Sequence, residues 1–100
     1  MKADLISTVE SSARRLFPAI NPEKAFAELL LERAQKNLIK YQVTARRFET
    51  KYQQDFSNFR NDILESDPNF EPEQDYFDWE MAITGIADMT SEIDNLRKLC

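Results

Sequence analysis

The chain has 100 residues, 42% of them apolar, and a formal net charge of −5 at pH 7. This length gives one domain with a modest hydrophobic core. One glycine and four prolines are too few for a fold of many strands and turns, whereas the residues that favour helices are abundant. We therefore predict an all-α protein, with a single helical domain over residues 1–100.

The sequence shows neither the pattern of a signal peptide nor that of a membrane span. The N-terminal segment carries Asp4 and Glu10 where a signal peptide needs an apolar stretch, and no apolar run reaches the roughly 18–20 residues of a membrane span. The single cysteine, Cys100, has no partner for an intrachain disulfide. These features predict a cytoplasmic protein that makes no membrane contact.

The charges are segregated along the chain. Residues 1–21 and 22–52 carry net charges of +1 and +3, whereas residues 53–100 carry −9. Between Asn61 and Leu96 there are eleven acidic residues and no basic one. Such a half repels nucleic acid and attracts basic proteins.

Apolar residues at helical spacing predict a first helix from about Ala3 to Phe17, within an N-terminal segment of residues 1–20. Arg14 and Arg15 suit its C-terminal end, where positive charge complements the helix dipole. The sequence FPAINP then ends this helix.

A long second helix is predicted over residues 21–52. Asn21 is a suitable N-cap, and Pro22 stands at the first helical position, where its missing N–H costs nothing. Apolar residues then alternate at spacings of 3 and 4, the pattern of a coiled-coil seam. The seam residues are Ala27, Leu31, Ala34, Leu38, Tyr41, Ala45, Phe48 and Tyr52.

Two further helices follow. Asp55 can cap a short helix over residues 55–66, and SDPNFEP, with two prolines, predicts an irregular connection. A last helix is predicted over residues 73–100, with Gly85 as a mild local weakness. Its seam residues are Trp79, Ala82, Ile86, Met89, Ile93, Leu96 and Cys100.

The two seams predict an antiparallel hairpin of the two long helices, with the short helix at the bend and the N-terminal helix separate. Several large apolar residues lie off both seams, and burying each would contribute about 1.5–3 kcal/mol. We therefore expect a partner chain, either a second copy or another protein. The off-seam residues are Phe26, Leu29, Leu30, Ile39, Val43, Tyr76, Phe77 and Ile83.

The residues for most enzyme chemistry are missing. The chain has no histidine to act as a base near pH 7, and one glycine cannot form a glycine-rich phosphate loop. Cys100 has no imidazole to activate it. Asp75 and Asp78 lack the loop pattern of a calcium site, and their spacing is typical of a solvated helix face. We expect no enzyme, no cofactor and no metal.

A basic cluster, Arg46, Arg47 and Lys51, accompanies Phe48 and Tyr52. Such a cluster can bind nucleic acid. Because the seam accounts for both rings and the overall charge opposes a phosphate backbone, we favour a structural role. The three bases are then expected to face acids of the last helix or of a second chain, and we expect no direct nucleic-acid contact.

The segment NFEPEQDYFDWEMA, residues 69–82, holds four aromatic and five acidic residues. One interpretation gives Trp79 to the seam and makes the other rings a plug that packs against Phe56 and Phe59 at the bend. The other makes the segment a docking patch, in which rings provide contact area and carboxylates select a basic partner. Both remain open, and the candidate partner-binding residues are Phe70, Asp75, Tyr76, Phe77, Asp78 and Glu80.

The order FETKYQQDFSNFRNDI, then NFEPEQDYFDWEMAI, then a helical tail resembles a family of small helical prokaryotic proteins. Its members resemble the antitoxin halves of two-gene toxin–antitoxin modules, which are paired with a small ribonuclease-like toxin. The match covers about residues 41–99, and it departs at Gln53 and Gln54, where the family has Gly and then an apolar residue. The resemblance implies a protein that neutralises a basic toxin by protein–protein contact.

Four functions are therefore compared. An antitoxin-like binding protein is the leading hypothesis, and a homodimeric helical scaffold or interaction module with no toxin partner is the alternative. A nucleic-acid-binding regulator ranks third and an enzyme fourth.

Overall fold

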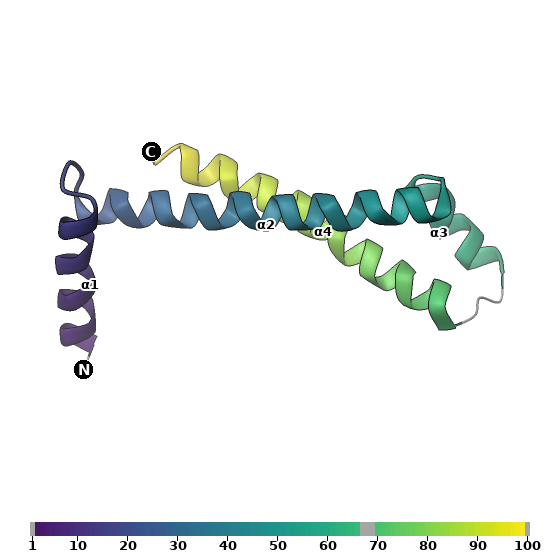
Figure 1. Cartoon of the computed structure of the whole chain (residues 1–100), viewed down its shortest axis with the longest axis horizontal. Coiled ribbons are helices and arrows are strands. Elements are labelled where there is room, and N and C mark those ends of the chain that lie inside the picture. Colours follow the sequence, from purple (N-terminus) through teal and green to yellow (C-terminus); the bar gives the residue numbers. More distant parts are fainter. Residues whose placement is uncertain (1, 67–69, 100) are drawn as a thin grey trace.

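The computed structural model describes residues 2–66 and 70–99 and is all-helical, as the composition predicts (Figure 1). Helices α2 and α4 pack against each other and run in opposite directions, α3 lies at their closed end, and α1 stands apart (Figure 1). The predicted helical hairpin is thereby confirmed. The helices are α1 (Lys2–Leu16), α2 (Pro22–Tyr52), α3 (Phe56–Glu65) and α4 (Phe70–Arg97).

The helix starts of α2 and α3 are capped by the side chains that the sequence indicated. Asn21 Oδ1 accepts a hydrogen bond of 2.8 Å from the backbone N–H of Lys24. Asp55 Oδ1 accepts one of 2.8 Å from the backbone N–H of Asn58. Each cap satisfies one of the N–H groups that a helix leaves free in its first turn.

Helix α4 begins at Phe70. The predicted start at Glu73 is three residues too late and was therefore wrong. Pro72 falls in the first turn, where a backbone N–H has no partner within the helix, so proline does not prevent helix formation there. The rest of the expected irregular connection, residues 67–69, lies outside the described residues.

Helix α2 ends at a left-handed residue. Gln53 has φ 51° and ψ 42°, in the region that favours glycine. The Gly expected at this position from the family resemblance is therefore the residue that this backbone prefers. Gln53 adopts the same turn at a steric cost of roughly 1–2 kcal/mol.

The two seams meet along the hairpin. Every predicted seam residue of α2 and α4 that the structure describes is buried or half-buried, whereas Cys100 lies outside the described residues. The core gathers around Trp79, which is fully buried. Its ring lies 5.7 Å from Phe48, 5.4 Å from Phe56 and 5.2 Å from Phe59, measured between centroids.

Apolar packing, not hydrogen bonding, keeps Trp79 in place. Its indole N–H is buried and has no acceptor among the described residues. An unpaired buried donor costs about 1–3 kcal/mol. Burial of a large aromatic side chain and its contacts with three other rings offset that cost.

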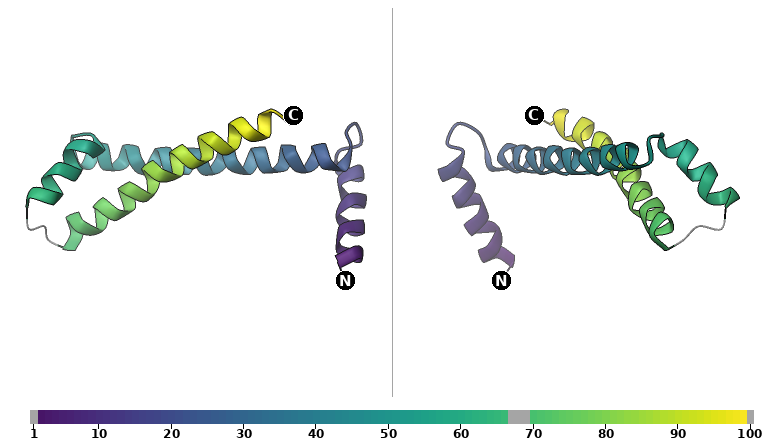
Figure 2. Two further views of the ribbon diagram at one scale, coloured as in Figure 1. Left: turned by 180° about the vertical axis from the view of Figure 1, so that it is seen from behind. Right: turned by 45° about the vertical axis from the view of Figure 1, so that its right-hand side comes forward.

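Much of the molecule lies outside this core. Helix α1 projects from the N-terminal end of α2 and leaves Leu5, Ile6 and Leu16 exposed (Figure 2). The radius of gyration is 19.6 Å, against about 13 Å for a compact domain of this length. None of the helices in the described part of the chain is long and apolar enough to cross a membrane.

Gly85 of α4 packs directly against the ring of Tyr41 of α2. A Cβ atom added at Gly85 would lie 2.6 Å from the ring of Tyr41, a distance that real Cβ contacts do not reach. The single glycine is therefore a packing requirement of the seam and not only a weak helix former.

Replacement of Gly85 by Ala is expected to lower the free energy of unfolding by about 1–3 kcal/mol, because the new methyl group overpacks the seam. Helix propensity alone predicts the opposite sign, a gain of about 1 kcal/mol. Urea unfolding followed by circular dichroism measures the change. In a Tyr41→Ala background the ring is absent, so Gly85→Ala should stabilise the protein; destabilisation there would contradict the overpacking.

Candidate protein-binding site

The acidic and aromatic segment forms the N-terminal half of α4, and its side chains do not share one environment. Asp75 and Tyr76 are half-buried, whereas Phe77, Asp78 and Glu80 are exposed. The side chain of Phe70 lies outside the described residues. The candidate residues therefore do not form one continuous surface.

Asp75 is engaged inside the hairpin. Its Oδ2 atom accepts a hydrogen bond of 2.6 Å from Lys51 Nζ and one of 2.5 Å from the Tyr52 hydroxyl. Lys51 also donates to Glu71 Oε1 at 2.7 Å. The side chain of Asp75 is only 14% exposed, whereas that of Glu71 is 74% exposed. Asp75 thus ties the end of α2 to the start of α4.

These contacts shift three pKa values. Partial burial raises the pKa of Asp75, but the bonds from Lys51 and Tyr52 outweigh it and leave the pKa below its usual value. Burial, with the bond to Asp75, raises the pKa of Tyr52 to about 12. The bonds to Asp75 and Glu71 raise the pKa of Lys51. At neutral pH the three groups are a carboxylate, a phenol and an ammonium ion.

Tyr76 fits the interpretation of the segment as a plug, and Phe77 fits its interpretation as a docking patch. The Tyr76 ring stacks on Phe56 of α3, with 5.6 Å between centroids, so Tyr76 belongs to the plug at the bend. Phe77 touches the edge of Tyr76 at 5.5 Å and remains 51% exposed. Phe77 is therefore the ring that points away from the seam.

Two exposed carboxylates, Glu73 and Glu80, lie about one helical turn before and after Phe77. Glu73, Phe77 and Glu80 follow at spacings of 4 and 3, so they lie on one side of α4, and all three are exposed. We call these three residues the acidic face of α4. Glu73 was absent from the candidate set, although its spacing from Phe77 was a signal that could have identified it.

Asp78 lies on a different side of α4. It lines an open hollow of about 290 Å³ together with Arg47 of α2 and the exposed Met81. Its carboxylate accepts a hydrogen bond of 3.2 Å from Gln74 Nε2. The structure thus separates Asp78 from the acidic face, which the sequence pattern did not do.

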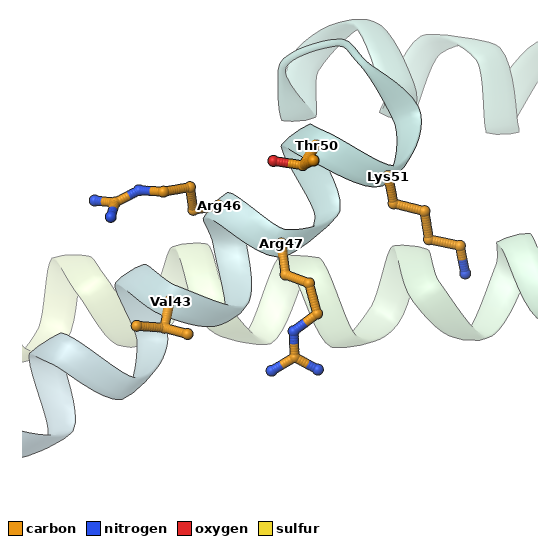
Figure 3. Close-up of a pocket in the computed structure, with 5 residues that line it drawn as sticks. All are labelled: Val43, Arg46, Arg47, Thr50 and Lys51. Atoms are coloured by element: carbon orange, nitrogen blue, oxygen red, sulfur yellow. The ribbon is translucent and has the colours of Figure 1, made fainter.

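The basic cluster divides as well. Lys51 faces acids of the last helix, as predicted. Arg46 and Arg47 have no carboxylate within 4.0 Å in the described ranges, and with Val43, Thr50 and Lys51 they line a second open hollow of about 520 Å³ (Figure 3). Arg47 points toward α4 whereas Arg46 points away from it (Figure 3). For the two arginines, a partner in a second chain stays a prediction.

No three potential metal ligands are grouped within residues 2–66 and 70–99. Comparison of the chain with protein-family models, curated proteins and solved structures finds no match.

Replacement of Asp75 by Asn is expected to lower the free energy of unfolding at pH 7 by about 1–3 kcal/mol, because two charge-dependent hydrogen bonds at a mostly buried carboxylate are lost. Since the pKa of Asp75 is depressed in the folded state, its stabilisation is present above the unfolded pKa of about 4 and is lost below it. Urea unfolding at several pH values between acid and neutral should show a flatter profile for the variant. Glu71→Gln is the control, because it removes the exposed partner of the same lysine. An equal loss from both variants would contradict the assignment.

Proposed function

We propose that the chain is an antitoxin-like protein that binds and neutralises a basic, ribonuclease-type toxin by protein–protein contact. The observation that carries the proposal is the exposed ring of Phe77 between the exposed carboxylates Glu73 and Glu80. A half-exposed aromatic ring provides contact area, and the acids around it favour a positively charged partner.

The charge of the surrounding surface supports a basic partner. The eleven acidic residues between Asn61 and Leu96 are not balanced by any basic residue of that segment. Of the basic side chains elsewhere, Lys51 forms ion pairs with Glu71 and Asp75 of this half, and Arg47 lines a hollow with Asp78. The acidic face of α4 therefore has no cation from its own segment to neutralise it.

The absence of histidine from the whole sequence supports a binding role over a catalytic one. The segments around Phe48–Tyr52 and Asp75–Glu80 resemble antitoxin-like proteins, and this resemblance favours a ribonuclease-like toxin as the partner. A positively charged RNA-cleaving cleft would meet the acidic face of α4 with complementary charge.

A second candidate function is a helical scaffold that associates only with itself. Exposed apolar side chains on α2, namely Leu29, Ile39 and Val43, favour this alternative. Such a protein would neutralise nothing, so a growth assay separates the two candidates.

Expression of the neighbouring gene of a two-gene module alone is expected to arrest bacterial growth, and co-expression of this chain is expected to restore it. Colony counts after induction measure both effects. If the neighbouring product is harmless, or if it stays toxic when this chain is present in excess, the antitoxin proposal is wrong and the scaffold alternative is favoured.

Replacement of Phe77 by Ala is expected to weaken binding of the purified toxin by at least about 2 kcal/mol, because a contact anchor is removed. The free energy of unfolding should change by less than about 0.5 kcal/mol, since the ring is half-exposed. Trp79→Ala is the matched control: loss of the buried ring should destabilise the fold by about 3–5 kcal/mol. Calorimetric titration and urea unfolding give the two quantities. Unchanged affinity in a folded Phe77→Ala protein would remove Phe77 from the interface.

A further inference from the structure

The hollow beside Asp78 is built by both long helices. Helix α2 supplies Tyr41, Thr44, Arg47 and Phe48, and helix α4 supplies Asp78, Met81 and Ala82. Tyr41, Phe48 and Ala82 are buried or half-buried seam residues, so they form an apolar floor. Met81 is 68% exposed beside this floor.

The rim of the hollow carries one charge of each sign. Arg47 stands on α2 and Asp78 stands on α4, and both side chains are exposed. The two residues do not form an ion pair with each other within 4.0 Å, and the hydrogen bond from Gln74 leaves most of the carboxylate of Asp78 available. One small surface thus combines an apolar hollow, a protruding flexible apolar side chain, a cation and an anion.

We propose that this surface is the contact between two copies of the chain related by a two-fold axis. In an isologous contact, residue i of each copy meets residue j of the other. Arg47 of one copy then pairs with Asp78 of the second copy, and the reverse pair forms by symmetry. The Met81 side chains fill the hollows, because an unbranched thioether adapts to irregular gaps.

The distribution of charge favours a second copy over another partner. A strongly basic partner would be repelled by Arg47, and a strongly acidic one would be repelled by Asp78. A surface that bears both signs complements itself when it is rotated by a half-turn. Contact between the two acidic faces of α4 would instead oppose like charges.

The chain exposes more surface than a compact protein of its mass does. The chain exposes 7642 Å², roughly 1,700 Å² more than the surface of about 5,900 Å² typical of a monomeric protein of 11.7 kDa. A standard interface covers about 800 Å² on each partner. Dimerisation through the hollow would therefore account for part of the excess and leave the acidic face of α4 available.

This inference does not depend on the proposed function. Glu73, Phe77 and Glu80 do not line the hollow, although Met81 lies one helical turn from Phe77. A dimer with no toxin partner, or a monomer that neutralises a toxin, would separate the two proposals.

The test exchanges the charges across the axis. Arg47→Glu places two acids opposite each other in both symmetric contacts, and Asp78→Arg places two bases there. Each single variant is expected to dimerise at least tenfold more weakly than the wild type, a loss of about 1.4 kcal/mol. An equimolar mixture of the two variants restores opposite charges in both contacts, so it should form a heterodimer.

Light scattering after size exclusion gives the masses at micromolar concentration, and native mass spectrometry identifies the heterodimer. The matched controls are Arg46→Glu and Glu80→Lys, which make the same kinds of charge reversal outside the hollow and should leave the wild-type dimer intact. Circular dichroism verifies that each variant is folded.

A monomeric wild type, single variants that dimerise as well as the wild type, or a mixture that stays monomeric would each overturn the proposal. If a single variant fails to fold, the double variant Arg47→Glu/Asp78→Arg decides, because it restores the opposite charges and should dimerise. Single variants that change the free energy of unfolding without changing the mass would assign the pair to one chain and would equally refute the dimer.

Discussion

Trp79 contacts rings of both α2 and α3, and the closed end of the hairpin depends on these contacts. Phe48, Phe56 and Phe59 surround the buried indole at centroid distances of 5.2–5.7 Å. The two long helices cross (Figure 1), and beyond this aromatic cluster the buried seam residues are smaller aliphatic ones such as Ala34 and Ile93. This one side chain thus joins α2, α3 and α4 at the bend.

The same constraint sets the side chains that α4 presents outward. Once Trp79 faces the seam, Asp75 lies beside Lys51, Tyr76 lies over Phe56, and Phe77 must point away. Helix α4 therefore places Asp75 in an ion pair within the hairpin, Tyr76 in the plug at the bend, and Phe77 on the exposed face. Neighbouring residues of one acidic segment thus occupy three different environments, because the orientation of α4 about its own axis decides which of them face α2, α3 or the outside.

The sequence allowed the prediction of the seams and of two helix caps, which depend on local periodicity and capping. The seam spacings and the caps Asn21 and Asp55 depend on residues a few positions apart, so they could be derived without a structure. The choice between Tyr76 and Phe77, and the pairing of Lys51 with Asp75, depend on how one helix is rotated against another. Periodicity does not contain that rotation. The start of α4 at Phe70 differs from the prediction because SDPNFEP has the composition of a connection, whereas Pro72 is tolerated in the first turn of a helix.

The only tryptophan of the chain lies at the closed end of the hairpin and is fully buried. Excitation at the red edge of the protein absorption band therefore reports on that end alone, and it is insensitive to α1 and to the open end of α2 and α4. Circular dichroism at far-ultraviolet wavelengths reports on all helices together. A difference between the two melting curves would measure fraying of the open end directly, whereas coincident curves would show that the hairpin melts as one cooperative unit.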